Sequence, residues 1–411
     1  MEEIFKKAKE ASRKVALMSD EERSCVLLAV ADAIEKGCDT LLEANAKDLS
    51  TLDASDPLYD RLKLTKERIA AIAADMRKVA SLPCPCGRTL EERVLPNGLK
   101  IKRVSVPFGV IGMIYEARPN VTFDVFSICL KSGNATILKG SRNADCSNRA
   151  AVGLIKEVLS AKGAPADCIS LLEPSHEATG RLLNAVGYVD LVIPRGGRKL
   201  IDFVRDNAKV PCIETGAGIV NTYFDRDGDI EKGRAIVTNA KTRRVSVCNA
   251  LDCLIIHADR LADLPQLTCA MKNVTIYADE RAYAALEGSH PAEKLQRADE
   301  SSFGTEWLDY KLSIRTVDSL DEALGHIARY GSGHSEAIVT ESSEAAERFQ
   351  AEVDAACVYV NAPTSFTDGA QLGLGAEIGI STQKLGSRGP MGLEAMNSYK
   401  WLITGSGQVR P

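Results

Sequence analysis

Apolar positions recur at helical spacing in the first part of the chain. A capping box formed by Ser19 and Glu22 precedes an apolar stripe with steps of three and four residues over 26–34. A second stripe covers 69–79 and ends before Pro83. Stripes confined to one side are typical of helices that pack on a core. The pattern therefore predicts a helical layer at the N-terminal end of the chain.

The spacing then changes to the alternation of a β-hairpin. The runs 93–96 and 99–104 flank Asn97-Gly98, the dipeptide best suited to a type I′ turn. A two-stranded ribbon is marginal by itself, so we expect another sheet or subunit to cover it. The run 399–403 has the pattern of a strand that could pair with this hairpin.

From Val106 onward, short apolar strands alternate with helical segments. The expected strands are 110–115, 136–138, 169–172, 191–193, 212–214, 251–256, 274–277, 312–317, 337–340 and 357–360. Apolar strands separated by helices are typical of parallel, doubly wound sheets. The chain length favours two such α/β units, and we place their junction at 235–245.

Composition narrows the classes of protein that fit. The chain has 411 residues, 45% of them hydrophobic, and 51 basic against 56 acidic residues give a net charge of −5. A general nucleic-acid binder would carry a basic surplus. The sequence contains no apolar run of membrane-spanning length and no secretory signal pattern at its start. We therefore predict a cytoplasmic protein with no nucleic-acid or membrane partner.

The 12 cysteines lack the paired spacing of a zinc site, so no metal is predicted. Only Cys84-Pro85-Cys86 is close-set. Cys248 follows the basic run 241–244 at the expected junction of the two units, where clefts form. Nearby cations and backbone donors would lower the pKa of a thiol there. The residues alone leave a nucleophile and a buried structural thiol equally open.

Two strand ends carry groups suited to phosphate. Lys139-Gly140-Ser141-Arg142 and Pro194-Arg195-Gly196-Gly197-Arg198 each follow a strand and precede a helix, where ligands gather in parallel sheets. Each signal is weak by itself, because basic residues at strand ends are usually solvated. The G-x-G-x-x-G fingerprint is absent.

Nine glycines between 369 and 407 indicate a loop that wraps close to other backbone or to a ligand.

Together these segments resemble a known family. The motifs that carry the resemblance are 106–122, 193–197, 239–242 with Cys248-Asn249, 358–362, 381–385 and 388–394. They are similar, in sequence and order, to those of the gamma-glutamyl phosphate reductases, which belong to the aldehyde dehydrogenase superfamily. The resemblance extends from about residue 5 to residue 405.

The resemblance implies an aldehyde-dehydrogenase-like α/β fold with two doubly wound parallel-sheet domains and a small β oligomerisation ribbon. We expect an NADP-binding domain at 1–92 and 106–238, a catalytic domain at 239–365, and the ribbon with its C-terminal strand at 93–105 and 385–411. The implied reaction is NADPH-dependent reduction of L-glutamyl 5-phosphate to L-glutamate 5-semialdehyde and phosphate, in proline biosynthesis. The implied partners are further copies of the chain and, less directly, glutamate 5-kinase.

The family's functional residues map onto this sequence by motif. Cys248 matches the nucleophile, whose thioester carries the glutamyl group, and Asn120 matches the oxyanion asparagine. The residues that match cofactor-binding positions are Lys139, Ser141, Arg142, Gly196, Gly197 and Glu306. Arg142 suits the 2′-phosphate of NADP, and Glu306 resembles the glutamate that touches the nicotinamide ribose.

Other positions are less determined. Arg118, Lys241 and Arg243 are candidates for the departing phosphate, although each could equally form a structural ion pair. Glu214 matches the glutamate that activates water in aldehyde oxidation. A reductive reaction needs no activated water, so we expect Glu214 to be dispensable.

The sequence departs from the family pattern at a few positions. Val245 stands where proline is usual, Val220-Asn221 replaces Cys-His, and Gly386-Ser387 replaces His-Ala. These changes leave open how the substrate carboxylate and amine are bound. Two alternatives stay open as well: an aldehyde dehydrogenase that deacylates with water or coenzyme A, and a non-catalytic scaffold that binds nucleotide.

Overall fold

The computed structural model describes residues 1–53, 56–116, 118–216 and 218–410. The chain forms two compact units. The first unit comprises Met1–Thr215, Gly373–Gly379 and Met391–Pro411, and the second comprises Gly216–Leu372 and Ile380–Pro390. Each unit contains its own parallel sheet, as the alternation of strands and helices predicts.

The first unit is built on a four-stranded parallel sheet. Its strands, in spatial order, are β5 (Ile169–Leu171), β4 (Ala135–Lys139), β3 (Val110–Tyr115) and β6 (Leu191–Arg195). All six residues of β3 are buried, as expected for a central strand covered on both faces. The strand expected at 212–214 is reduced to a single parallel bridge between Val192 and Cys212.

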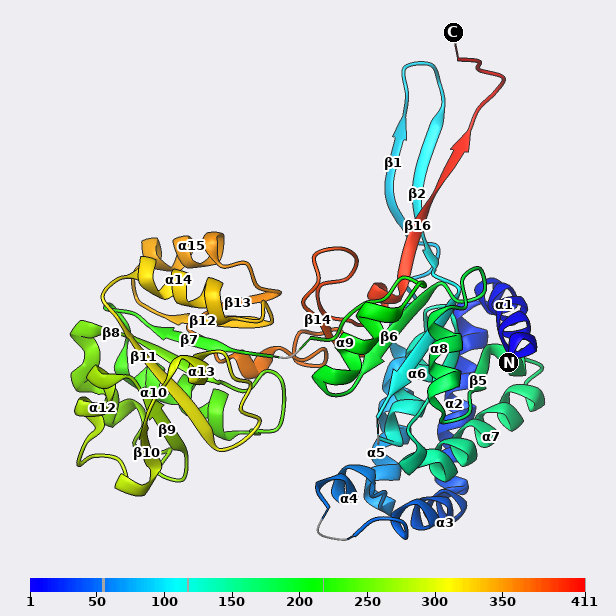
Figure 1. Cartoon of the computed structure of the whole chain (residues 1–411). Helices are drawn as coiled ribbons and strands as arrows, with labels where there is room; N and C mark the ends of the chain where they lie inside the picture. Colours follow the sequence, from blue (N-terminus) through cyan, green and yellow to red (C-terminus); the bar gives the residue numbers. More distant parts are fainter. Residues whose placement is uncertain (54–55, 117, 217, 411) are drawn as a thin grey trace. The chain divides into compact units, whose positions relative to one another are not determined.

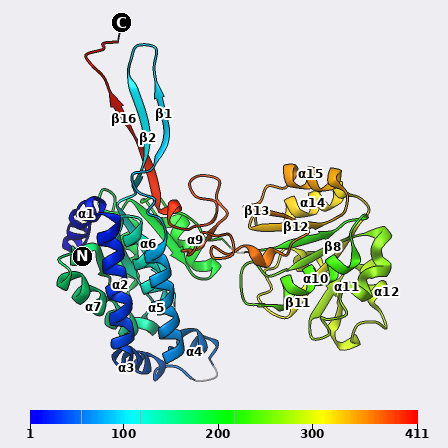
Figure 2. The same ribbon diagram turned by 180° about the vertical axis from the view of Figure 1, so that it is seen from behind.

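Helices cover both faces of this sheet. They are α1 (Glu2–Leu17), α2 (Asp20–Lys36), α3 (Cys38–Leu49), α4 (Pro57–Leu62), α5 (Lys66–Ser81), α6 (Asn120–Lys131), α7 (Asp145–Ala161), α8 (His176–Leu183) and α9 (Arg198–Asn207). Helices α2, α5, α6 and α7 pack together on one face (Figure 2), and α1, α8 and α9 lie on the other. Right-handed crossovers between parallel strands produce this division. The predicted capping box at Ser19 and Glu22 is present at the start of α2.

A three-stranded antiparallel ribbon projects from the first unit (Figure 1). It consists of β1 (Thr89–Val94), β2 (Lys100–Pro107) and β16 (Asn397–Thr404), in that order. Strand β16 pairs with β2 along its whole length, which confirms the predicted partner of the hairpin.

The hairpin turn differs from the predicted type I′. Gly98 has a φ of 86°, whereas Asn97 is not among the residues with positive φ. Leu95 N–H donates to Leu99 O at 2.8 Å, so three residues form the loop. A type I turn followed by glycine in the left-handed region is the next most common solution, and the additional loop residue makes it possible here.

The second unit contains a seven-stranded parallel sheet. Its strands, in spatial order, are β10 (Leu295–Arg297), β9 (Thr275–Ala278), β11 (Lys311–Val317), β8 (Cys253–His257), β7 (Asn221–Phe224), β12 (Ser335–Val339) and β13 (Cys357–Val360). Two of these, β7 and β10, are not among the strands expected from the sequence. Both are short, and polar residues interrupt their apolar pattern.

Two separate apolar clusters bury the faces of this second sheet. One cluster involves α10 (Ile230–Thr242), α11 (Leu264–Leu267) and α12 (Glu280–Leu286). The other involves α13 (Glu300–Phe303), α14 (Leu320–Tyr330) and α15 (Ser343–Glu352). Short 3₁₀ turns complete the elements: η1 (Arg142–Ala144), η2 (Ala166–Cys168), η3 (Ala258–Asp263), η4 (Ala292–Lys294), η5 (Thr364–Phe366) and η6 (Glu394–Met396).

The boundary between the units lies earlier than expected. The compact units divide after Thr215, whereas the sequence placed the division at 238/239. The reason is β7, which pairs with β8 and β12 and so draws itself and α10 into the second sheet. The segment 385–390, expected with the ribbon, also belongs to the second unit.

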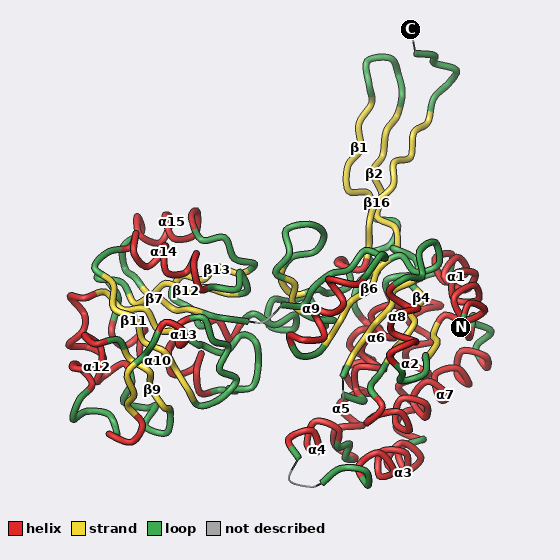
Figure 3. The backbone as a smooth tube through the Cα atoms, viewed as in Figure 1, coloured by secondary structure: helices red, strands yellow, loops and turns green. Residues whose placement is uncertain are grey.

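The glycine-rich stretch after Asn361 is mainly loop (Figure 3). Its regular structure is η5 and a two-stranded pair, β14 (Ile380–Ser381) with β15 (Gly389–Pro390). Within the described residues, none of the helices has both the length and the apolar character needed to cross a bilayer.

Candidate active site

Cys248 lies in a turn between α10 and β8, at the amino end of the second sheet, and is half-buried. Its neighbour Asn249 fastens this turn. The Asn249 amide donates to Thr367 O at 2.9 Å and to Ser365 O at 3.4 Å. In return, the Thr364 hydroxyl donates to Asn249 O at 2.9 Å. A cysteine between such fixed residues has a defined position, as a nucleophile requires.

Gly218 supports the Cys248 turn from the other side. A Cβ built on Gly218 would lie 1.8 Å from Cys248 O, far inside any van der Waals contact. Gly218 precedes β7 and Cys248 precedes β8, and these two strands are neighbours in the sheet. Only a residue without a side chain fits between them.

Glu306 shares this corner of the second unit. Its Oε1 accepts the Gly218 N–H at 3.0 Å, so Cys248, the candidate nucleophile, and Glu306, the candidate for the nicotinamide ribose, flank one glycine. The next residue, Trp307, donates its N–H to Asp252 Oδ1 at 3.0 Å. Asp252 also accepts the Val220 N–H at 3.3 Å. The segment that carries Glu306 is therefore fixed to the start of β7.

Lys241 is fully buried, and its geometry fits the structural ion pair raised as an alternative. Its Nζ donates to Leu251 O at 2.9 Å, and it interacts electrostatically with Asp252. Burial lowers the pKa of Lys241 and raises that of Asp252, while each partner opposes the shift of the other. An ammonium so placed stabilises the turn before β8, and its assignment to the phosphate stays a prediction.

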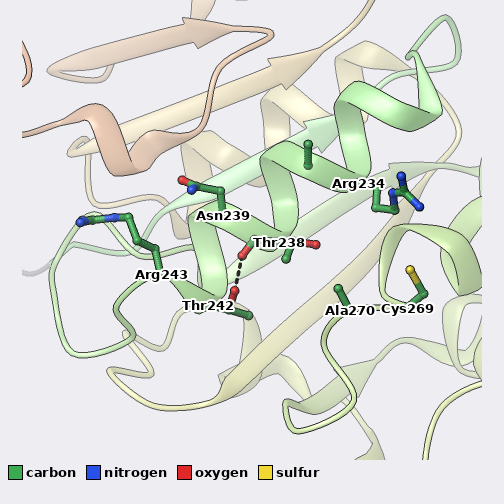
Figure 4. A pocket seen from close by; sticks show the side chains of 8 residues that line it. Arg234, Thr238, Asn239, Thr242, Arg243, Cys269 and Ala270 are labelled. Atoms are coloured by element: carbon green, nitrogen blue, oxygen red, sulfur yellow. Dashed lines mark hydrogen bonds between the residues drawn. The ribbon is translucent and has the colours of Figure 1, made fainter.

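Arg243 lies at the exposed end of α10 and lines a shallow depression of about 500 Å³. Figure 4 shows that most of the lining side chains, Arg234 and Asn239 among them, come from α10, while Cys269 comes from a later segment. Thr242 donates to Thr238 O at 2.7 Å within the helix. The depression has a cation at Arg243, and nothing in it assigns a ligand.

The other predicted site residues come together in the first unit. Asn120 follows β3, the segment 139–142 follows β4, and Gly196-Gly197 follows β6. These three strands are adjacent and parallel, so all three segments lie at the carboxyl edge of one sheet. Ligands of open α/β sheets bind at such an edge. The fold therefore brings together the candidate cofactor residues of the first unit and the candidate oxyanion amide.

Asn120 begins α6 and is half-buried. Its Nδ2 donates to Asp124 Oδ2 at 2.9 Å. Because a primary amide carries two N–H donors, one remains for an oxyanion. Burial raises the pKa of Asp124 to about 6, while Arg195 and the Asn120 amide oppose the shift. Asp124 thus orients the candidate oxyanion donor, although burial destabilises the charged form of its own carboxylate.

We expect Asp124→Asn to stabilise the protein. A carboxyl whose pKa is raised on folding does not lower the free energy of unfolding below about pH 4. It lowers that free energy progressively more up to about pH 6, and by a constant amount above that. The asparagine should raise the free energy of unfolding by about 1–2 kcal/mol at neutral pH and make no difference at about pH 4. Urea unfolding at both pH values measures this. Exposed Glu157 on α7, replaced by glutamine, is the control, and unchanged stability of Asp124→Asn at neutral pH would contradict the expectation.

The segment after β4 fits the adenosine end of a dinucleotide. Ser141 Oγ is buried and has no hydrogen-bond partner among the described residues, so a ligand hydroxyl or phosphate oxygen there would satisfy it. Arg142 is exposed and Lys139 is half-buried; desolvation lowers the pKa of Lys139. Gly197 N–H, at the start of α9, donates to Glu116 Oε2 at 3.0 Å.

No group of three or more metal-ligating side chains occurs in the part of the chain that the structure describes.

Two further predicted residues lie in the first unit. Arg118 is exposed, and its backbone N–H donates to Glu116 O at 2.7 Å. Glu214 is largely buried, and its Oε2 lies 3.7 Å from Arg205 Nη1 on α9. This ion pair holds Glu214 against the helix that starts at Gly197.

The residues that fix the position of Cys248, the candidate nucleophile, were not predicted from the sequence. Gly218, Asp252 and the segment 364–367 were not predicted to belong to the site. The glycines around 216–218 were a usable signal, because paired glycines before a strand often mark close backbone approach. Nothing local marks 364–367, which reaches Asn249 only through the fold.

Comparison with known proteins identifies the family to which this chain is similar. The model of the aldehyde dehydrogenase family matches residues 1–286. The gamma-glutamyl phosphate reductases of Bacteroides thetaiotaomicron and Parabacteroides distasonis are 61% and 58% identical to the chain; the first alignment covers 99% of this chain and 98% of the relative, the second 100% and 99%. The crystal structure of gamma-glutamyl phosphate reductase from Thermotoga maritima superposes with a TM-score of 0.95 at 37% identity, covering 100% of this chain and 99% of that one.

The chain therefore belongs to the gamma-glutamyl phosphate reductases, within the aldehyde dehydrogenase family, and is an oxidoreductase. The family resemblance and the aldehyde-dehydrogenase-like α/β fold expected from the sequence are confirmed.

Proposed function

We propose that the chain reduces L-glutamyl 5-phosphate to L-glutamate 5-semialdehyde and phosphate, with NADPH as reductant and Cys248 as nucleophile. The observation that carries the proposal is the fixed Cys248 turn, in a chain whose full-length relatives bear the name gamma-glutamyl phosphate reductase. The reaction is a step of proline biosynthesis.

The chemistry follows from the chain's own groups. The Cys248 sulfur attacks the acyl carbon, the bond to the phosphate oxygen breaks, and a thioester forms. Phosphate is a good leaving group because it departs as an anion whose charge is delocalised over its oxygen atoms. The Asn120 amide and the Cys248 backbone N–H stabilise the oxyanion, and losing one such donor costs about 3 kcal/mol of barrier.

The cofactor-binding residues are assigned in each unit by their match to the family motifs. In the first unit, Lys139, Ser141 and Arg142 would hold the adenosine end and Gly196 and Gly197 would approach the pyrophosphate; in the second, Glu306 would bind the nicotinamide ribose. When bound, the reduced nicotinamide supplies the hydride that reduces the thioester. Cys248 then leaves as a thiolate as the aldehyde forms. Exposed Arg118 and Arg243, together with buried Lys241, remain the candidates for the departing phosphate.

The test is the reverse reaction. With glutamate 5-semialdehyde and NADP, formation of NADPH should require inorganic phosphate, because phosphate must attack the thioester to release the product. Arsenate, which has the same charge and shape, should replace phosphate. Turnover without phosphate would support a water-deacylating dehydrogenase instead, and turnover that requires coenzyme A would support an acylating one. Absence of any turnover, with nucleotide binding retained, would support a scaffold.

Arg142 should set the preference for NADPH. We expect Arg142→Glu to raise the KM for NADPH by about tenfold or more, because the guanidinium that faces the 2′-phosphate becomes a carboxylate. The KM for NADH should change little or fall. Steady-state kinetics with both cofactors measure this, and exposed Arg13 on α1, which the proposal places in no binding site, provides a matched charge reversal. An equal rise in both KM values would contradict a role at the 2′-phosphate.

Glu214 should be dispensable for reduction. Thioester reduction needs no activated water, so we expect Glu214→Gln to keep the reductive kcat within about tenfold of the parent. Both variants lose the ion pair with Arg205, whereas Glu214→Ala also removes the rest of the side chain, so comparing the two separates the effect of charge from that of packing. A loss beyond about 100-fold in the glutamine variant, the scale of a general base, would overturn this expectation.

The ribbon provides the proposed oligomer contact. Its outer strand β16 exposes Tyr399, Trp401, Leu402 and Ile403, and such apolar side chains on one strand favour a protein contact. We propose a cytoplasmic homo-oligomer joined through this ribbon. A contact with glutamate 5-kinase stays a prediction.

A further inference from the structure

The close-set cysteines of the segment between α5 and β1 face a buried cation. Arg23 of α2 is 2% exposed, and its Nη1 donates to Cys84 Sγ at 3.1 Å. Its other nitrogens donate to the carbonyl oxygens of Val15, at 3.1 and 3.3 Å, and Ala16, at 3.3 Å. Neutral carbonyl groups solvate a guanidinium but do not neutralise it. A buried cation with these partners favours negative charge on the sulfur it contacts.

Cys86 supplies two more donors to the same sulfur. Its backbone N–H donates to Cys84 Sγ at 3.4 Å, and its thiol hydrogen-bonds to that sulfur. The single S–H proton of Cys86 has a second acceptor, Ser132 O at 3.0 Å. As Cys84 loses its proton, the charged sulfur becomes the stronger acceptor, and the Cys86 proton turns toward it.

The titration behaviour agrees with this geometry. The hydrogen bond from the Cys86 thiol and the cation of Arg23 together lower the pKa of Cys84 to about 6, although burial of Cys84 works in the opposite direction. The contact with Cys84 and burial raise the pKa of Cys86. Asp20, at the start of α2, opposes the shift of Cys84, but its carboxylate is engaged by Lys131 Nζ at 2.5 Å.

The two cysteines are partly exposed and close enough to join. Cys84 and Cys86 are each half-buried. Two residues in sequence separate their Cα atoms by at most about 7 Å, the upper limit for a disulfide. The Cys84 sulfur accepts hydrogen bonds from both the backbone N–H and the thiol of Cys86, so the two sulfurs are already in contact.

We propose that Cys84 and Cys86 form a peroxide-reactive dithiol, with Cys84 as the attacking sulfur and Cys86 as the resolving one. The oxidant is hydrogen peroxide or another small hydroperoxide. The Cys84 thiolate attacks one peroxide oxygen, the O–O bond breaks, and a sulfenic acid and water form as a proton is taken up. The Cys86 sulfur then displaces the hydroxyl group from Cys84, which gives a disulfide and a second water. The pair loses two electrons and two protons.

This site is separate from the proposed catalytic thiol and lies at the base of the ribbon. Asn397, the first residue of β16, donates to Cys86 Sγ at 3.5 Å and to Ser132 O at 3.3 Å. Formation of the disulfide removes the Cys86 proton from Ser132 O and turns the sulfur toward Cys84. Oxidation should therefore alter the contact between the end of α6 and the start of β16.

The experiment measures oxidation of the peptide that contains both cysteines. The full-length Cys248→Ala chain is treated with a limited amount of hydrogen peroxide at neutral pH, quenched with an alkylating reagent, digested and analysed by mass spectrometry. We expect the peptide to lose two hydrogen atoms about tenfold faster than exposed Cys25 and Cys269 are oxidised. The readout needs no enzyme activity, so it stands or fails apart from the proposed function.

Variants assign the two roles. In Cys86→Ser, a sulfenic acid should persist on Cys84 and be trapped by a 1,3-diketone. In Cys84→Ser, Cys86 should react no faster than the exposed cysteines. Arg23→Met should slow Cys84 oxidation, and Arg23→Lys should restore part of it. Because loss of a buried guanidinium can unfold the protein, circular dichroism checks each variant.

The pH profile tests the same arrangement in the unaltered segment. Alkylation of Cys84 should reach half of its maximal rate near pH 6, well below the value of about 8.5 that is ordinary for a thiol. Equal oxidation rates for Cys84, Cys25 and Cys269 would overturn the proposal. A sulfenic acid on Cys86 in the Cys84→Ser variant, or a Cys84 alkylation profile centred at the ordinary thiol value of about 8.5, would also overturn it.

Discussion

Replacing Cys248 by alanine should abolish phosphate-dependent formation of NADPH from glutamate 5-semialdehyde. We expect kcat to fall by at least about ten-thousandfold, the scale on which enzymes lose activity when a covalent nucleophile is removed. The turn should survive, because Asn249 and the backbone of Gly218 hold it without the sulfur. Cofactor binding, followed by the fluorescence of bound NADPH, should be unchanged.

Cys269 offers the matched control for this substitution. It lies in the same unit and is exposed, and Cys269→Ala should keep full activity. A Cys248→Ala variant that retains more than about one hundredth of the parent kcat would contradict a thioester on this sulfur.

Gly218→Ala should damage catalysis although residue 218 carries no reactive group. A methyl group there meets Cys248 O at 1.8 Å, so either the turn before β8 or the start of β7 must move. Displacement of a nucleophile by about 1 Å costs about 100-fold in rate. We expect kcat to fall on that scale. The contact of Gly218 N–H with Glu306 should be strained as well, so that the KM for NADPH rises.

Gly325 on α14 provides the comparison. A Cβ built there meets no atom within 4 Å, so Gly325→Ala should leave the kinetics unchanged and slightly stabilise the helix. Thermal unfolding of both variants separates misplacement from unfolding. If Gly218→Ala keeps the parent kcat, the Cys248 turn does not depend on this close approach.

Much of the fold could be predicted from local pattern. The strand expected at 110–115 coincides with β3, because six consecutive buried apolar residues mark a central parallel strand. The pairing of β16 with the hairpin was also anticipated. Strand β7 was missed, since it is four residues long and begins Asn-Thr. That omission moved the predicted boundary past the true one at Thr215.

The candidate site, like the fold, could be predicted from the sequence only in part. Segments that directly follow strands, such as 139–142, could be located because strand order places their ends at one edge of a sheet. Cys248 itself lies at the amino end of the second sheet, where the rule of carboxyl ends gives no guidance. Its supports come from distant parts of the chain, and no sequence spacing encodes such contacts. The buried position of Lys241 could not be foreseen either, because its partner, Leu251 O, is a backbone atom.

The anchoring of Asn249 by Thr364, Ser365 and Thr367 has a consequence for how this enzyme tolerates change. Substitutions in a segment more than a hundred positions downstream will be selected against as strictly as those beside the reactive thiol. A deep mutational survey scored by growth without proline should reveal that intolerance. Anyone grafting the cysteine turn into another scaffold would have to transplant both stretches together.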